Sequence, residues 1–208
     1  MFGDFSGQIL MSNRGQIMQD SKSATKLREL ETQLIALNNE IEKVRAEQIP
    51  VEVENYKFQT LSGEVALMDL FGQREQLMLI HNMGSGCPFC TLWADGINGH
   101  LPHMESVLSV VLVSHESPEY QRKFAIDRGW RFNLASHGGG KYIKDQCVFG
   151  QADNYPGAVV YRKEGDKIMR LNRAAFGGGD QFNAFYGLMS LADFDSDAWQ
   201  PQYHYDQK

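Results

Sequence analysis

Apolar and polar residues recur along this chain with two periods, which separate helical segments from extended ones. Over residues 23–47 the apolar positions alternate spacings of three and four, as in the a/d stripe of a coiled coil. These positions are Leu27, Leu30, Leu34, Leu37, Ile41 and Val44. Ser21, Ser23 or Thr25 can cap this helix, and Pro50 follows its end. The region 21–49 is therefore predicted to be one amphipathic helix.

The stripe has two interpretations. It packs on the globular part of the same chain, or it forms a homodimer through residues 23–47. In a parallel dimer the flanking positions pair Lys26 with Glu31 and Glu40 with Arg45, and both pairs are attractive.

Shorter apolar runs predict the strands of a globular part at residues 50–192. Residues 51–54 alternate, Ser62-Gly63 marks a hairpin turn, and the runs 77–80 and 107–113 are continuous enough for buried strands. A second hairpin is predicted around residues 164–166, between the strands 158–161 and 167–171. Trp130 to Ala135 is a further candidate strand.

Helices are predicted between these strands. One follows Cys87, interrupted by Gly96, Gly99 and Pro102. Others run from Ser117-Pro118 to Gly129 and from residue 180 to about 191, whereas residues 141–155 show no clear pattern. Strands that alternate with helices predict an α/β fold with a parallel core and an antiparallel hairpin at its edge.

Composition and charge restrict the function. The 208 residues suffice for one core with an appendage, and 42% hydrophobic and 22% charged residues are ordinary for a globular protein. A net charge of −6 argues against general binding to nucleic acid or anionic membranes. No signal peptide or membrane-spanning run is recognised, so a cytoplasmic location is expected. Residues 1–20 are predicted to be a flexible tail, and the structure of the C-terminal tail 193–208 is left open.

Two of the three cysteines suggest a chemistry. Cys87-Pro-Phe-Cys90 follows the strand 77–80 after a turn containing Gly84 and Gly86, and Pro88 suits the first turn of a helix. Free N–H groups and the dipole at a helix start stabilise a thiolate. The second sulfur lies about one turn along, so the pair is predicted to be a redox dithiol that needs no cofactor.

Other interpretations remain open. Cys87, Cys90, His100 and His103 form a C-x2-C-x9-H-x2-H pattern, with later gaps shorter than those of zinc fingers. Such a zinc site requires the helix to bend back at Gly96 or Gly99. The pair could also be incidental in a non-catalytic binding module. Cys147 is expected to be a free, largely buried cysteine.

Several motifs carry a resemblance to a known family. They are His81, Cys87-Pro-Phe-Cys90, Trp93-Ala-Asp-Gly96, Asn98-Gly99, Leu101-Pro-His103, Gly129-Trp-Arg-Phe132 and Pro156-Gly157. With the order of elements, they resemble the thioredoxin fold. More closely, they resemble a bacterial thioredoxin-like family of unknown function, labelled predicted dithiol–disulfide oxidoreductases and related to peroxiredoxins. The resemblance covers roughly residues 23–162.

The resemblance implies roles for four residues. Cys87 is the attacking sulfur, and Cys90 the resolving one. Pro156 occupies the place of a cis-proline that faces the disulfide. His81 stands where thioredoxins carry a buried acid, and we hypothesise that it relays protons to Cys90, for which its ordinary pKa of about 6.5 is suited.

The expected activity is thiol–disulfide exchange with a protein or small-molecule disulfide. Peroxidase activity is an alternative, because the domain resembles peroxiredoxins. Those enzymes bind peroxide with Pro-x-x-x-Thr-x-x-Cys, and here Ile80 and Gly84 stand at the positions of the proline and the threonine. Peroxide is therefore the less favoured substrate.

Overall fold

The protein is described by a computed structural model for residues 22–150, 153–192, 194–195 and 198–205. The predicted flexible tail 1–20 and the candidate cap Ser21 lie outside these residues. The chain divides into two compact units, residues 1–47 and residues 48–208. No helix in the described ranges is long and apolar enough to cross a membrane.

The first unit contains helix α1 (Lys22–Ala46), in agreement with the predicted amphipathic helix. None of its residues is buried. The six side chains of the apolar stripe are 40–58% exposed. Among the described residues, the stripe therefore leaves a large part of its apolar surface exposed.

We propose that a second copy of α1 covers this stripe in a parallel homodimer, since Lys26 then meets Glu31 and Glu40 meets Arg45 of the second copy. Leu34→Lys should raise the dimer dissociation constant at least about a hundredfold, because the charge is buried without a partner. Ile35→Lys, outside the stripe, is the control and should remain dimeric. Sedimentation equilibrium of the full chain measures both. A monomeric parent protein, or equal effects of the two variants, would refute the dimer.

The second unit is built on one eight-stranded sheet with the order β1-β8-β7-β4-β5-β6-β2-β3. Its strands are β1 (Val51–Val53), β2 (Lys57–Thr60), β3 (Gly63–Ala66), β4 (Gln76–His81), β5 (Ser109–Ser114), β6 (Asn133–Ser136), β7 (Gly157–Glu164) and β8 (Lys167–Ala175). Strands β4, β5 and β6 are parallel, and β7 and β8 form an antiparallel hairpin beside β4. The predicted α/β architecture is confirmed, although β1 rather than the β7–β8 hairpin forms that edge.

The helices of this unit are η1 (Asp69–Phe71), α2 (Pro88–Met104), α3 (Pro118–Arg128), α4 (Lys141–Gln146) and α5 (Ala184–Ser190). The caps predicted for α3 are confirmed: the Ser117 side chain accepts the Tyr120 N–H, and Gly129 ends the helix in the left-handed conformation. Helix α4 was not predicted. Helix α5 is shorter than predicted, because Asn183 rather than residue 180 caps it.

Helix α2 is continuous, so the predicted interruptions at Gly96, Gly99 and Pro102 are wrong. One face of α2 buries Trp93, Ala94, Ile97 and Leu101. Each glycine costs a helix only about 1 kcal/mol relative to alanine. Burying a large apolar side chain contributes about 1.5–3 kcal/mol, so the packing of this face outweighs the glycines.

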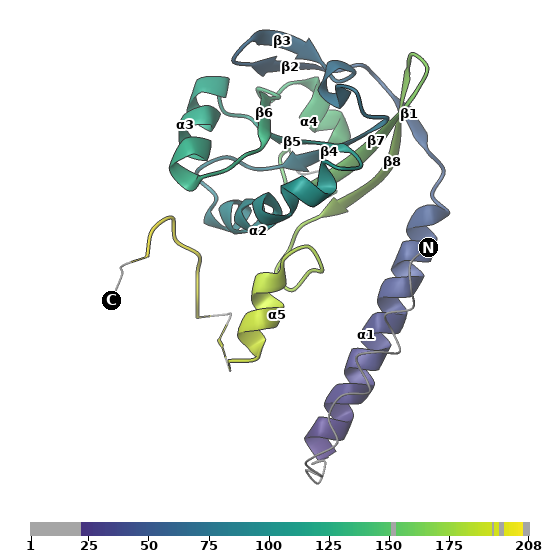
Figure 1. The fold of residues 1–208 in the computed structure, drawn as a ribbon, viewed down its shortest axis with the longest axis vertical. Coiled ribbons are helices and arrows are strands. Elements are labelled where there is room, and N and C mark those ends of the chain that lie inside the picture. The colour runs from purple at the N-terminus through teal and green to yellow at the C-terminus, as the bar shows by residue number, and fades with distance from the viewer. Residues whose placement is uncertain (1–21, 151–152, 193, 196–197, 206–208) are drawn as a thin grey trace. The chain divides into compact units, whose positions relative to one another are not determined.

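Alternate residues of β4 face opposite sides of the sheet. Leu77 and Leu79 belong to a core that includes Tyr142 of α4, whereas Ile80 packs with Trp93 of α2. The central strands therefore lie between α2 on one face and α4 on the other (Figure 1). This alternation decides which side chains of β4 can approach the cysteines.

Candidate redox site

The two cysteines form a disulfide at the start of α2, with their Cα atoms 5.3 Å apart. Cys87 is the N-cap residue, and its sulfur accepts the Cys90 backbone N–H at 3.1 Å. Pro88 occupies the first turn, as predicted. Cys87 is half-buried, whereas Cys90 is 2% exposed. An attacking sulfur must be accessible to the substrate, whereas a resolving sulfur needs only to reach the attacking one, and the two exposures fit these roles.

The loop before Cys87 is shaped by Gly84, whose φ of +105° strongly favours glycine. The Asn82 side-chain oxygen accepts the Gly84 N–H at 2.8 Å. A Cβ at Gly84 would lie 3.0 Å from the side chains of both His115 and Glu116. The positive φ and these two close contacts therefore disfavour a threonine at the position where peroxiredoxins carry one.

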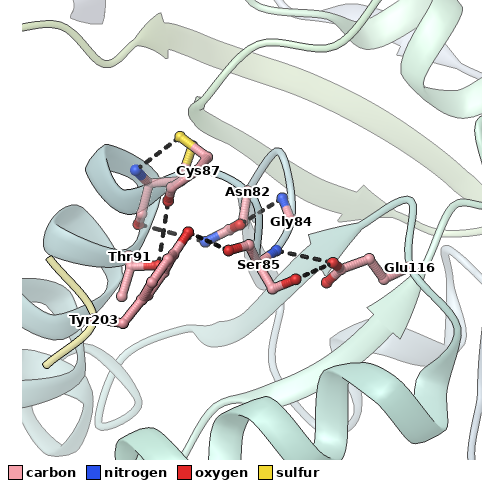
Figure 2. Close-up of a disulfide and its surroundings, with 8 residues drawn as sticks. Asn82, Gly84, Ser85, Cys87, Thr91, Glu116 and Tyr203 are labelled. Atoms are coloured by element: carbon pink, nitrogen blue, oxygen red, sulfur yellow. Dashed lines mark hydrogen bonds between the residues drawn. A yellow bond between two sulfur atoms is a disulfide. The ribbon is translucent and has the colours of Figure 1, made fainter.

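Glu116 and Tyr203 hold this loop from two sides (Figure 2). The Glu116 carboxylate accepts hydrogen bonds from the Ser85 N–H at 2.9 Å and from the Ser85 hydroxyl at 2.6 Å. The Tyr203 hydroxyl donates to the Ser85 carbonyl oxygen. Sequence reasoning missed both residues. Glu116 follows the carboxyl end of a parallel strand, which is a usable signal, whereas nothing in the sequence around Tyr203 indicates its contact.

The C-terminal residues also hold α2. The Trp93 indole N–H donates to Asp180 at 3.1 Å, and the Trp93 ring stacks on Phe176. Trp93 is buried in the core on this face of the sheet. The next turn is fixed by Asp95, which forms an ion pair with Arg128. The first turns of α2 are thus held by Asp180 and by Arg128 of α3, in addition to the core packing of Trp93.

His81 lies on the face of the sheet opposite α2. It is 2% exposed, and its Nε2 is 2.6 Å from the Tyr142 hydroxyl. Burial lowers its pKa to about 3, so the imidazole stays neutral between pH 6 and 9. The expectation that it titrates near neutral pH is therefore wrong, and the hypothesis of a proton relay to Cys90 loses its basis. His81 points to this face because side chains alternate along β4, and His81 therefore shares the face of Leu77 and Leu79.

His81 instead begins a buried polar network on the α4 face. The Tyr161 hydroxyl donates to the Tyr142 hydroxyl at 3.3 Å, and burial raises the pKa of both phenols. His137, 6% exposed, flanks the Tyr142 ring, and burial lowers its pKa to about 4. Among the described residues, His81 Nδ1 and His137 Nε2 have no hydrogen-bond partner. Both imidazoles are thus held neutral inside the fold.

Pro156 does not follow a cis peptide bond, because no peptide bond among the described residues is cis. The prediction of a cis-proline is therefore wrong. Trans is the more stable form of an X–Pro bond by about 0.5–1 kcal/mol. The Pro156 carbonyl oxygen accepts the Phe176 N–H at 2.9 Å, which extends the pairing of β7 with β8. Pro156 thus enters the strand in the default geometry.

The alternative zinc site is ruled out because α2 is one continuous helix. His100 and His103 are exposed on the same helix as Cys90. A continuous helix rises about 24 Å from residue 87 to residue 103, which forbids shared coordination. Within the described part of the chain, no group of three metal-ligating side chains is suited to hold an ion. Cys147 is a free cysteine, 6% exposed, as expected.

Comparisons with known proteins relate this chain to a family and to a fold. Residues 16–196 match the model of a family described as bacterial protein of unknown function (DUF899). A search of curated proteins found no sequence match.

Two solved structures show the fold. One is a cysteine-to-serine mutant of PrxQ from Xylella fastidiosa, with a TM-score of 0.53 and 15% identity over 71% of this chain and 98% of that one. The other is the bacterioferritin comigratory protein of Xanthomonas campestris, a protein with alkyl peroxide reduction activity. Its TM-score is 0.51, with 15% identity over 66% of this chain and 91% of that one. The predicted thioredoxin-like, peroxiredoxin-related fold is therefore confirmed.

Proposed function

We propose that this chain, which belongs to the DUF899 family of bacterial proteins of unknown function, is a thiol–disulfide oxidoreductase. The observation that supports this proposal is the position of Cys87 as the N-cap of α2, where its sulfur accepts the Cys90 N–H. The same N–H group, with the helix dipole, stabilises a thiolate when the pair is reduced. Cys90 lies within disulfide distance and is shielded from solvent.

In the proposed reaction the Cys87 thiolate attacks one sulfur of a substrate disulfide. A bond forms between Cys87 and that sulfur, the substrate S–S bond breaks, and the other half leaves as a thiolate that takes a proton from water. Cys90 then loses its proton and attacks Cys87, which closes the Cys87–Cys90 disulfide and releases the second half as a thiol. The substrate gains two electrons and the protein loses two. The reverse sequence oxidises a dithiol substrate.

Peroxide reduction is the less favoured activity, although the structural neighbours are peroxiredoxins. The turn at Gly84 has a positive φ, and a Cβ there would lie only 3.0 Å from the Glu116 side chain. It therefore lacks the hydroxyl that a peroxiredoxin threonine offers. A half-buried thiol with a resolving partner three residues away fits disulfide exchange better.

Titration of the thiols tests the proposal. In reduced protein, the pKa of Cys87 should lie at least one unit below the free value of about 8.5. The thiolate absorbance of wild-type, Cys87→Ser and Cys147→Ser proteins against pH gives this pKa. Titration with glutathione buffers should then show a reversible Cys87–Cys90 disulfide. The Cys147→Ser control should behave as wild type in both measurements, because that thiol is buried and forms no disulfide. An ordinary Cys87 pKa together with a pair that never oxidises would exclude the proposed reaction.

A further inference from the structure

A pocket of about 310 Å³ lies beside the first two turns of α2. Pro88, Thr91 and Leu92 form its wall on α2. Phe185 of α5 and Trp199 of the C-terminal segment form the facing wall. No property of the sequence predicted this pocket, because its two walls come from segments about a hundred residues apart.

The facing wall is an aromatic cluster. The rings of Phe185 and Trp199 stack with centroids 4.7 Å apart. Phe194 meets Phe185 and Trp199 edge to face, at 5.8 Å and 5.5 Å. Aromatic pairs in these arrangements stabilise each other beyond their buried area. The wall is therefore a preformed apolar surface.

The charged side chains that line the pocket already form an ion pair and hydrogen bonds within the protein. Asp95 and Arg128 form an ion pair. Asp95 also accepts the Trp130 indole N–H at 2.7 Å, and Arg128 donates to the Tyr203 carbonyl oxygen. The Thr91 hydroxyl donates to the Cys87 carbonyl oxygen at 3.2 Å. An uncharged apolar group therefore fits this pocket better than an ion or an amide-rich segment, whose polar groups would go unpaired.

The pocket is close to the reacting sulfur along the helix. Pro88 follows Cys87 directly, and Thr91 contacts the Cys87 backbone. The wall of the pocket therefore begins at the residue next to the one that carries the reacting sulfur. The volume is near the lower limit of about 300 Å³ for small-molecule sites, which suits one ring or short branched chain.

We infer that the pocket binds the aryl or branched alkyl group of a low-molecular-weight disulfide while Cys87 attacks the sulfur that carries it. This inference rests on the proposed function and names its substrate class. The bound group is held next to the bond that breaks, and the second half of the disulfide leaves to solvent as a thiolate. Cys90 then displaces the bound half as a thiol, and the protein is left with the Cys87–Cys90 disulfide.

Rates with two uncharged disulfides test the inference. Reduced full-length protein is mixed with 2,2′-dithiodipyridine, which carries aromatic rings, or with bis(2-hydroxyethyl) disulfide, which is polar. Trp199→Ala should lower the second-order rate constant of Cys87 with the aromatic probe about tenfold, in the range that apolar pocket contacts contribute. The rate constant with the polar probe should change less than about twofold, since it makes no use of the pocket. Met189→Glu, which places a charge at the pocket wall from the surface of α5, should act in the same way.

Phe149→Ala is the matched control, because Phe149 is an exposed aromatic residue that does not line the pocket. It should leave both rate constants unchanged. If Trp199→Ala and Met189→Glu leave the rate constant with the aromatic probe unchanged, the pocket is not the substrate site. Reaction of Cys87 with the polar probe would still support the proposed function. If wild-type Cys87 reacts with neither probe, the proposed function fails. If the two variants impair only a peptide disulfide with a neighbouring phenylalanine, the low-molecular-weight class is wrong.

Discussion

Cys90→Ser protein mixed with excess bis(2-hydroxyethyl) disulfide should retain one half of the reagent covalently on Cys87, whereas Cys87→Ser protein should retain none. The reason is the order of attack. Cys87 is the more exposed sulfur at the helix start, and Cys90 is buried behind it. Without Cys90, the mixed disulfide has no internal thiol to resolve it. Without Cys87, the remaining thiol cannot reach a substrate from its buried position.

Intact-mass measurement detects this adduct, and a dithiothreitol-coupled assay measures turnover. Cys87→Ser should lower the rate of disulfide reduction by at least about three orders of magnitude, as expected when a nucleophile is removed. Cys147→Ser is the matched control and should keep wild-type turnover, since Cys147 is buried outside the site. An adduct on Cys90 rather than on Cys87 would reverse the assigned roles. The absence of an adduct from every variant would contradict the reaction itself.

Lowering the pH from 7 to 5 should reduce the free energy of unfolding of the globular unit by about 4 kcal/mol, through His81 and His137 alone. Burial lowers the pKa of His81 to about 3 and that of His137 to about 4, whereas both titrate near 6.5 when unfolded. Below pH 6.5 the unfolded chain therefore binds protons that the folded chain excludes. The loss begins near pH 6.5 and continues to about pH 4 for His137 and about pH 3 for His81, at about 1.4 kcal/mol per pH unit for each histidine.

Urea unfolding at pH 7, 6 and 5 measures this loss. His81→Asn and His137→Asn should each remove about half of the pH dependence. His81→Asn should also lower stability at pH 7, because the Tyr142 hydroxyl loses one of its two hydrogen bonds. His100→Asn, at an exposed position of α2, should leave the pH dependence unchanged. Equal pH dependence in wild-type protein and both buried-histidine variants would show that these imidazoles are not held neutral.

Local chemistry explains how much of the fold was predictable. Ser117 caps α3 through a hydrogen bond to a residue three positions away, and Gly129 ends that helix by its own backbone conformation. The turns of both predicted hairpins lie where glycine allows a positive φ, at Gly63 and Gly165. Cys87 and Cys90 meet because side chains three positions apart lie next to each other at the start of a helix. Each of these features involves residues close in sequence, so composition and spacing were sufficient.

The wrong predictions share a different cause. Local rules for glycine predicted breaks in α2, but the sheet packs against its apolar face and keeps it continuous. The resemblance predicted a cis bond before Pro156, but that bond is trans. The identity of His81 suggested a titrating group near the cysteines. The strand instead turns that side chain to the face of Tyr142, where burial keeps it neutral.

For this protein, the sequence by itself determined the helical stripe of α1, the order of the strands and of every helix except α4, and a disulfide-forming pair at the start of α2. Those features depend on contacts within a few residues. Only the tertiary structure decided what surrounds the pair: Glu116 and Tyr203 on its loop, and Phe185 and Trp199 across the pocket. These side chains come from distant segments, and folding of the sheet brings them together, which no local pattern encodes.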